Sequence, residues 1–250
     1  MTRIFSGFLL ILLFNSYLVA QTANEISEQP LYRPTGNEAT LVGTISVEGA
    51  IPARKRIDMT ADAICLEINR EPETEDVIVK DNRVRNTFVY LKSDVLQSFR
   101  FELPTSDVTL QHINCTYSPH VLAMRVGQTL RIVNADPTPH NTHPTPRYNP
   151  EWNASQPQGA EALPKTFLRD EVLVPFKDNM HAWEKAYVAV LSHPFFAVSD
   201  DFGRFEIRGV PPGTYKLVIW HEGFGTKQVD VTLVPNEIRN ADFTFNTEKP

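Results

Sequence analysis

Three side chains that can bind a metal ion lie close together in one short segment of the chain. Asp178, His181 and Glu184 follow a strand-like run at 171–176 and precede another at 186–191. A loop between two strands can turn alternate side chains into one small cavity. Imidazole nitrogens and carboxylate oxygens together suit Cu(II) or Zn(II), with Mn(II) and Fe(II) bound more weakly. The segment therefore predicts part of a metal site.

An earlier segment can supply a further imidazole. His140 lies between Pro139 and Asn141, and His143 follows in the same stretch. We predict His140 as the ligand that completes the site, with His143 in reserve because a loop could bring both rings to one ion. The remaining histidines fall in or beside strand-like runs and are predicted to be structural: His112, His120, His193 and His221.

The N-terminus has the features of a secretory signal peptide. Arg3 is followed by an apolar run at 4–13 and then by Ala20, which gives a positive start, a short apolar centre and a small residue before cleavage. Asn15 interrupts the run and leaves too few apolar residues for a membrane anchor. We expect residues 1–20 to be removed and the mature chain, without a membrane span, to be periplasmic or secreted.

The overall composition is that of a globular protein. The chain has 250 residues, of which 42% are hydrophobic and 22% charged, so it is long enough for one or two domains with buried cores. Its formal net charge of -6 argues against nucleic acid or an anionic membrane as the main partner.

The two cysteines, Cys65 and Cys115, are predicted to form one disulfide. In an oxidising compartment an isolated pair usually does so, and closing such a loop is worth about 4 kcal/mol in the chain-entropy model. The alternative is that one of them is a copper thiolate. It is less favoured because neither has a histidine a few residues downstream at ligand spacing.

The periodicity of the chain favours strands almost throughout. Residues 21–38 are polar and predict a flexible leader, and alternation begins with a strand at 40–47. Thr60 can cap a short helix at 61–68 that carries Cys65. No helix of ordinary length is predicted, and the fold class is all-β.

One long stretch, 136–164, lacks clear periodicity and is rich in proline. Loops of this length are uncommon in compact domains unless they have a function. It contains Tyr148 and Trp152. These rings either pin the loop to its own domain or form a surface that stacks on a ligand such as a sugar.

The middle of the chain, 101–193, resembles a cupredoxin, a Greek-key copper sandwich. The resemblance rests on Tyr117-Ser118-Pro119, on the strand ending Ile132-Val133-Asn134 and on Pro139-His140-Asn141. In that family the histidine after the proline is the first copper ligand, which implies this role for His140. The family's second ligand cluster of Cys, His and often Met falls on positions 178, 181 and 184.

The flanking parts resemble a transthyretin-like, carboxypeptidase regulatory-like β-sandwich. The matching residues are Gly43-Thr44-Ile45, the run 201–207 and Pro211-Pro212-Gly213-Thr214-Tyr215. Because they lie on both sides of the cupredoxin-like part, the resemblance implies a discontinuous sandwich formed by 39–100 and 194–250, with the other domain inserted. Such chains are similar to exported bacterial proteins labelled methylamine-utilisation or cupredoxin-domain proteins.

The ligand set departs from the cupredoxin pattern. Asp178 stands where the family has its copper thiolate, and Glu184 stands where it has its axial methionine. A blue-copper centre depends on the cysteine sulfur, so we expect no such centre. Two imidazoles and two carboxylates remain, which predicts a copper or zinc ion held by His140, Asp178, His181 and Glu184. The alternative is a degenerate site that holds no metal.

Three functions follow from these patterns. The first is an exported, non-catalytic metal-binding protein, since the sequence has neither a Gly-x-Ser-x-Gly nor a His-Glu-x-x-His motif. The second is a metal-free module that binds a glycan or an exported protein partner. The third is an atypical copper electron carrier.

Overall fold

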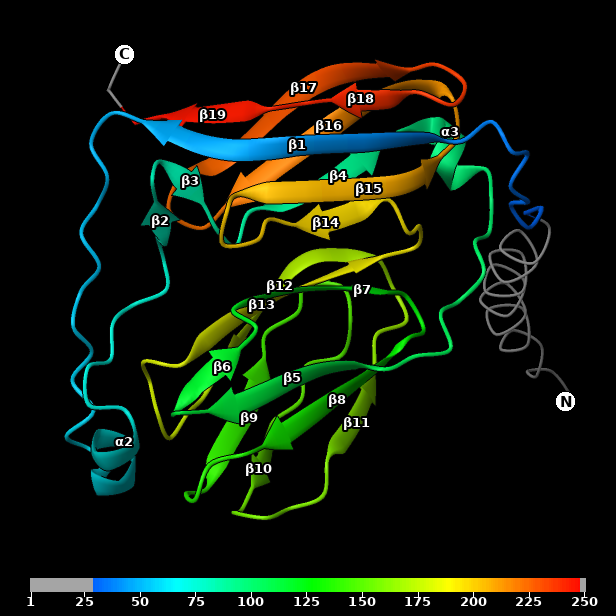
Figure 1. Cartoon of the computed structure of the whole chain (residues 1–250). Helices are drawn as coiled ribbons and strands as arrows, with labels where there is room; N and C mark the ends of the chain where they lie inside the picture. Colours follow the sequence, from blue (N-terminus) through cyan, green and yellow to red (C-terminus); the bar gives the residue numbers. More distant parts are fainter. Residues whose placement is uncertain (1–28, 248–250) are drawn as a thin grey trace, which may run out of the picture.

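The computed structural model describes residues 29–247 (Figure 1). The predicted signal peptide, 1–20, and the start of the predicted leader lie outside the described residues. The described part contains two short helices, α2 (Ala63–Ile68) and α3 (Asp94–Gln97), and is otherwise made of strands and loops. The predicted all-β fold class is confirmed. Within 29–247, no helix is long and apolar enough to cross a membrane.

The first sandwich is made of two sheets from the two ends of the described chain. One sheet has the order β15-β1-β3-β2, with β18 and β19 also paired to β1, and the other has the order β14-β4-β16-β17. The first sheet comprises β1 (Ala39–Glu48), β2 (Val79–Lys80), β3 (Arg83–Val84), β15 (Arg204–Val210), β18 (Ile238–Asn240) and β19 (Phe243–Asn246). The second comprises β4 (Phe88–Lys92), β14 (Phe196–Val198), β16 (Gly213–His221) and β17 (Gly225–Leu233).

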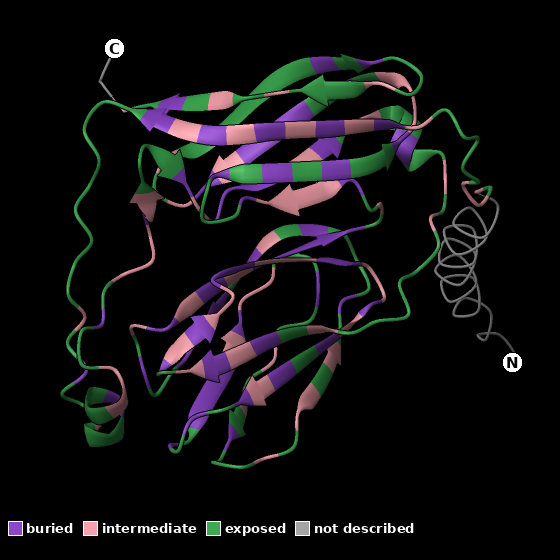
Figure 2. Ribbon diagram, viewed as in Figure 1, coloured by how far each residue is buried: buried purple, intermediate pink, exposed green. Residues whose placement is uncertain are grey.

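Strand β1 shows why this part of the sequence forms a sandwich. Its residues alternate between buried and partly exposed along the strand (Figure 2), as expected when one face packs on a core. Gly43 lies on the buried face, and a side chain there would lie 2.6 Å from the ring of Phe205 on the paired strand β15. The glycine therefore leaves room for that ring.

The second sandwich is formed by the middle of the chain. One sheet has the order β10-β9-β12-β13-β7 and the other β11-β8-β5-β6. The first comprises β7 (Val121–Arg125), β9 (His140–Pro144), β10 (Ala154–Gln156), β12 (Glu171–Lys177) and β13 (Lys185–Leu191). The second comprises β5 (Val108–Ile113), β6 (Thr116–Ser118), β8 (Thr129–Asn134) and β11 (Leu163–Thr166). The stretch 136–164, predicted to lack periodicity, thus contains two short strands and the start of a third; their polar and proline-rich sequences hide the alternation.

The two sandwiches meet through an apolar interface on which β13 is central. Its Val188 and Val190 belong to the core of the second sandwich, whereas Ala189 and Leu191 pack in a separate cluster with Phe88 of the first sandwich. Both faces of the strand are therefore covered, which explains its nearly continuous apolar sequence.

A long segment of the first sandwich crosses to the second. Residues 49–78, here called the strap, leave β1, descend along the second sandwich to α2 and return to β2 (Figure 1). The disulfide between Cys65 and Cys115 ties α2 to the β5–β6 connection. Around α2 the strap thus contacts the second sandwich, although the sequence analysis placed all of 39–100 in the first.

The described part of the predicted flexible leader also makes defined contacts. Leu31 forms a bridge with Arg100, and the ring of Tyr32 lies 5.5 Å from that of Phe99 and 5.3 Å from that of Phe101. These aromatic contacts attach residues 29–38 to the segment that links the two sandwiches.

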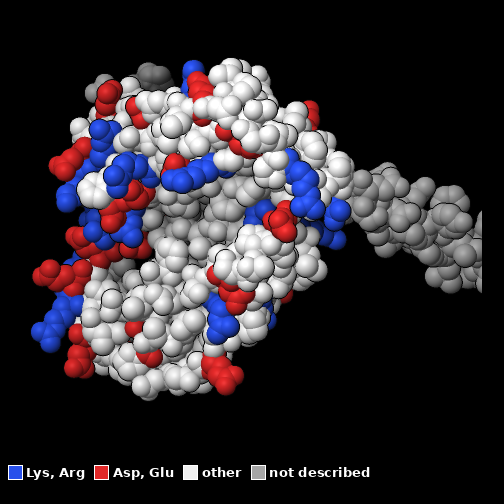
Figure 3. Space-filling view, turned by 45° about the vertical axis from the view of Figure 1, so that its right-hand side comes forward, with Lys and Arg blue, Asp and Glu red and all other residues white. Residues whose placement is uncertain are grey.

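Charged side chains do not form a single-sign patch on the face shown in Figure 3. Lysines and arginines are intermixed there with aspartates and glutamates. This pattern agrees with the small net charge of the sequence and offers no basic surface for nucleic acid on that face.

Candidate metal centre

The loop 178–184 is folded around the carboxylate of its first residue. Asp178 Oδ1 accepts hydrogen bonds from the backbone N–H groups of Met180 (2.6 Å) and His181 (3.0 Å). Aspartate favours such turns because its short side chain can bond to the backbone two residues ahead. The turn directs His181 back toward Asp178, and Glu184 closes the loop at the start of β13.

Strand pairing brings the earlier histidine to this loop. Strand β9 begins with His140 and pairs with β12, which ends at Lys177 directly before the loop. The backbone N–H of Asn141 donates a hydrogen bond of 3.0 Å to Asp178 Oδ2. His140 is therefore fixed beside the loop by backbone contacts that do not depend on its own ring.

Four potential ligand atoms converge on one buried point. His140 Nδ1 lies 3.0 Å from His181 Nδ1, from Asp178 Oδ2 and from Glu184 Oε1. His181 Nδ1 lies 3.3 Å from Asp178 Oδ2 and 3.8 Å from Glu184 Oε1. All four residues are 2% exposed or less. The structure thus brings together the four predicted ligands.

These separations match the needs of a four-coordinate ion. Metal bonds of about 2.0–2.1 Å to nitrogen and oxygen hold tetrahedral ligand atoms about 3.3 Å apart, close to the measured distances. Glu184 Oε1 is buried, and among the described residues it lies against the ring nitrogens of His140 (3.0 Å) and His181 (3.8 Å). A buried carboxylate is costly without a positive charge beside it, so a cation at this point would serve Asp178 and Glu184 together in place of a proton on His140. The residues present fit the ion.

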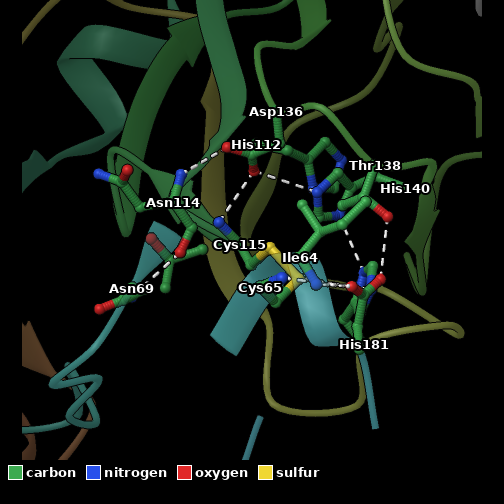
Figure 4. Close-up of a disulfide and its surroundings, with 12 residues drawn as sticks. Ile64, Cys65, Asn69, His112, Asn114, Cys115, Asp136, Thr138, His140 and His181 are labelled. Carbon is green, nitrogen blue, oxygen red and sulfur yellow. Dashed lines mark hydrogen bonds and ion pairs between the residues drawn. A yellow bond between two sulfur atoms is a disulfide. The ribbon is translucent and has the colours of Figure 1, made fainter. Parts of the chain in front are cut away.

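The other nitrogen of each ring is held by a second carboxylate, and Figure 4 shows the first of these contacts, between Asp136 and His140. His140 Nε2 lies 3.1 Å from Asp136 Oδ2, and His181 Nε2 lies 3.1 Å from Asp62 Oδ2. A carboxylate on Nε2 keeps the proton there and turns the lone pair of Nδ1 toward the ion, as is usual for histidine ligands. The two outer carboxylates therefore hold both rings with Nδ1 facing the four-atom cluster.

Asp62 reaches the centre because it caps the helix of the strap. It is the N-cap of α2, and its Oδ1 accepts hydrogen bonds from the N–H groups of Ile64 and Cys65. The sequence analysis assigned this cap to Thr60, which instead donates to Asp58. The prediction was wrong because aspartate and threonine both suit the position, and only the packing against His181 distinguishes them.

A third imidazole belongs to the centre although it was predicted to be structural. His112 Nδ1 lies 2.8 Å from Glu184 Oε2, and its Nε2 lies 2.9 Å from Thr142 Oγ1. Its ring stacks on that of His140 at 4.4 Å. The alternation of β5 indicates that His112 faces inward, but no sequence signal placed it beside Glu184.

The carboxylates set the charge state of the rings. Burial lowers the pKa of His140, but hydrogen bonds to Asp136, Asp178 and Glu184 outweigh it and raise this pKa to about 11. For Asp178, burial raises the pKa, but hydrogen bonds from His140, His181 and the backbone hold it far below its usual range. Without an ion, a proton on His140 thus takes the place of the metal's positive charge.

The reserve ligand and the two loop aromatics lie outside the cluster. His143 faces away from it, because residues an odd number apart on a strand point to opposite faces, and its Nε2 contacts Glu151 Oε1 at 2.6 Å. The ring of Trp152 packs edge-on against Phe176 and lies under the ammonium of Lys165. The ring of Tyr148 is exposed.

Comparison with known proteins finds similarity in two parts of the chain. The model of the carboxypeptidase regulatory-like domain matches residues 180–246, starting inside the metal-site loop rather than at 194. No curated protein matches.

Among solved structures, the chain is similar to several copper proteins. It is 17% identical to amicyanin from Paracoccus versutus (36% of this chain, 85% of that one; TM-score 0.31) and 20% identical to a purple cupredoxin from Nitrosopumilus maritimus (34% and 99%; 0.30). It is 21% identical to a copper-containing nitrite reductase from Thermus scotoductus, covering 35% of this chain and 23% of that one, with a TM-score of 0.32. At these scores, the case for a metal depends on the geometry of the centre.

Proposed function

We propose that the chain is an exported, non-catalytic metal-binding protein that holds one Cu(II) or Zn(II) ion. The ligands are His140 Nδ1, His181 Nδ1, Asp178 Oδ2 and Glu184 Oε1. The observation that carries the proposal is that these four buried atoms face one point, with His140 Nδ1 3.0 Å from each of the other three.

A storage, sensing or structural role suits this set better than catalysis. Four protein ligands fill a tetrahedral shell, whereas catalytic zinc sites keep one position for water or substrate. All four residues are buried, as are the outer carboxylate Asp136 and the third imidazole His112. A substrate therefore has no open position on the ion.

The donor atoms also decide which ion and which oxidation state are favoured. Two carboxylates and two imidazoles are harder donors than a thiolate, and they favour Cu(II) or Zn(II) over Cu(I). The cysteine disulfide within the fold supports export, since disulfides persist in oxidising compartments. A bound Cu(II) would lack the intense colour of a copper thiolate.

The test is a metal titration on the full mature chain after chelator treatment. Calorimetry with Zn(II) or Cu(II) should give one equivalent per chain, and the copper-loaded protein should show no intense thiolate-to-copper absorption. His143→Gln is the matched control, because that ring lies outside the cluster and its loss should leave the stoichiometry at one. Folded protein that takes up neither ion rules the proposal out.

A further inference from the structure

We propose a second metal site, formed when the Cys65–Cys115 disulfide is reduced. It lies at the Nε2 side of the His181 ring, whereas the first site lies at the Nδ1 side. Its ligands are the thiolates of Cys65 and Cys115, His181 Nε2 and a carboxylate oxygen of Asp62. The site takes a soft or borderline ion, Cu(I) or Zn(II). It does not rest on the proposed function, because it uses none of the four atoms of the first site.

The disulfide lies within ligand distance of the outer face of the rings (Figure 4). Cys65 Sγ is 3.7 Å from His181 Nε2, and the ligand atoms of Asp62, Cys65 and His181 all lie within 4.8 Å of one another. For an ion with bonds of about 2.3 Å to sulfur and 2.0 Å to nitrogen, a tetrahedral site needs these two atoms about 3.6 Å apart. The sulfur and nitrogen are already placed for it.

Cys115, the other half of the disulfide, belongs to a second group of potential ligand residues. The ligand atoms of Cys115, Asp136 and His140 likewise lie within 4.8 Å of one another. Because the two sulfurs are bonded to each other, the two groups adjoin at the disulfide. Both cysteines are fully buried, so a charged thiolate pair released here would need a cation beside it.

Reduction supplies the missing ligands. A dithiol gives two electrons and two protons to the disulfide and itself becomes a disulfide; Cys65 and Cys115 become thiols. The ion, Cu(I) or Zn(II), then displaces both thiol protons into solvent as its two bonds to sulfur form. The sulfurs must separate to about 3.8 Å around the ion. Helix α2 can follow, since it lies midway along the strap and residues such as Ile64 and Leu66 are exposed there.

The two sites compete for one ring. A neutral imidazole has a single lone pair, so His181 binds either through Nδ1 to the first site or through Nε2 to the second. Filling the thiolate site therefore withdraws His181 from the oxygen-rich site. Reduction would in this way move the binding preference from hard to soft ions.

The experiment uses the full mature chain reduced with a phosphine under argon and then titrated with Co(II). The reduced protein should develop the near-ultraviolet thiolate-to-Co(II) absorption, and both thiols should become unreactive toward a disulfide dye as Co(II) binds. The oxidised protein should show neither change. Asp178→Asn/Glu184→Gln, which removes the first site, should retain both signals.

Two controls test whether the absorption comes from Cys65 and Cys115. Cys65→Ser/Cys115→Ser should lose the absorption, and alkylation of the reduced wild-type chain should do the same without any substitution. The proposal is overturned if the reduced chain shows no thiolate absorption or keeps both thiols reactive at saturating Co(II). Loss of the β-sheet circular-dichroism signal on reduction, before metal is added, also overturns it.

Discussion

The described part of the molecule contains a buried polar cluster and a partly buried one that use similar residues to different ends. The metal centre gathers His140, His181, Asp178 and Glu184 inside the second sandwich. The interface cluster, formed by His120, Lys185, Tyr187 and Glu222, joins the second sandwich to the first. In both, a histidine ring and a carboxylate are in contact away from bulk water.

The clusters differ in how donors and acceptors are matched. In the interface cluster, one carboxylate serves three donors: Glu222 accepts from His120 at 2.7 Å, from Tyr187 at 3.0 Å and from Lys185. In the metal centre, two carboxylates and two ring nitrogens face one point without a lysine or arginine. Buried charges are stable only when paired. The first cluster thus has its cation in Lys185, whereas the second needs a proton on His140 or a bound cation.

The largest expected effect separates the clusters by metal affinity. Glu184→Gln should weaken Zn(II) binding by about a hundredfold or more, since it removes a ligand, and ligand loss should exceed the 10–100-fold typical of outer-shell changes. Glu222→Gln makes the same chemical change in the interface cluster and should leave the affinity unchanged. Titration calorimetry measures the Zn(II) affinity of both variants. Equal losses of affinity would contradict the assignment of the ion to the cluster that contains Glu184.

The reverse comparison concerns stability. Glu222→Gln weakens the acceptor shared by His120, Tyr187 and Lys185 and should destabilise the metal-free fold by roughly 1–3 kcal/mol, as is typical when a buried donor loses its acceptor. Urea unfolding of the metal-free protein measures this. A shift below 0.5 kcal/mol would mean that Glu222 is not needed to join the sandwiches.

Outer carboxylates should have an intermediate effect on the ion. Asp136→Asn and Asp62→Asn remove the groups that orient the two rings, and each should weaken Zn(II) binding about 10–100-fold. Calorimetry again measures the affinity, with Asp58→Asn as a control on the strap, since among the described residues Asp58 hydrogen-bonds to Thr60. Unchanged affinity in both outer variants would contradict the assigned ring orientation.

The pH dependence should separate the clusters in the metal-free protein. The pKa of His140 is raised to about 11 in the fold, so its contribution is complete below about 6.5 and is lost as pH rises toward 11. For Glu222, burial raises the pKa, but His120 and Lys185 lower it to about 2; its contribution is complete above about 4.5 and is lost as pH falls toward 2.

The urea midpoint of the metal-free protein should therefore decrease both at alkaline pH and at acid pH. His140→Ala should remove the alkaline decline, and Glu222→Gln should remove the acid one. Bound Zn(II) should reverse the alkaline limb, because the proton on His140 must leave before the ion binds. An alkaline decline that persists in His140→Ala would place its cause elsewhere.

The smallest effect is expected at the ring predicted as a reserve ligand. His143→Gln should change the Zn(II) affinity less than about twofold and the stability by less than about 0.5 kcal/mol, as for surface substitutions without special contacts. A larger loss of affinity would bring this ring into the centre in the metal-bound state.

The sequence by itself determined the local features of this protein. Alternating apolar residues specify strands such as β1, the loop between β12 and β13 carries its three ligands at fixed spacing, and the two cysteines form the expected disulfide. Each of these follows from periodicity, from a turn or from the count of one residue type. Such signals depend on neighbours along the chain.

Only the tertiary structure decided how distant segments complete the centre. His112 meets Glu184 across two sheets, and Asp62 reaches His181 because the strap crosses to the second sandwich. His143 is excluded because β9 turns it to the opposite face from His140. These outcomes depend on which strands pair and which faces pack, and the chain positions involved have no local pattern that records their partners.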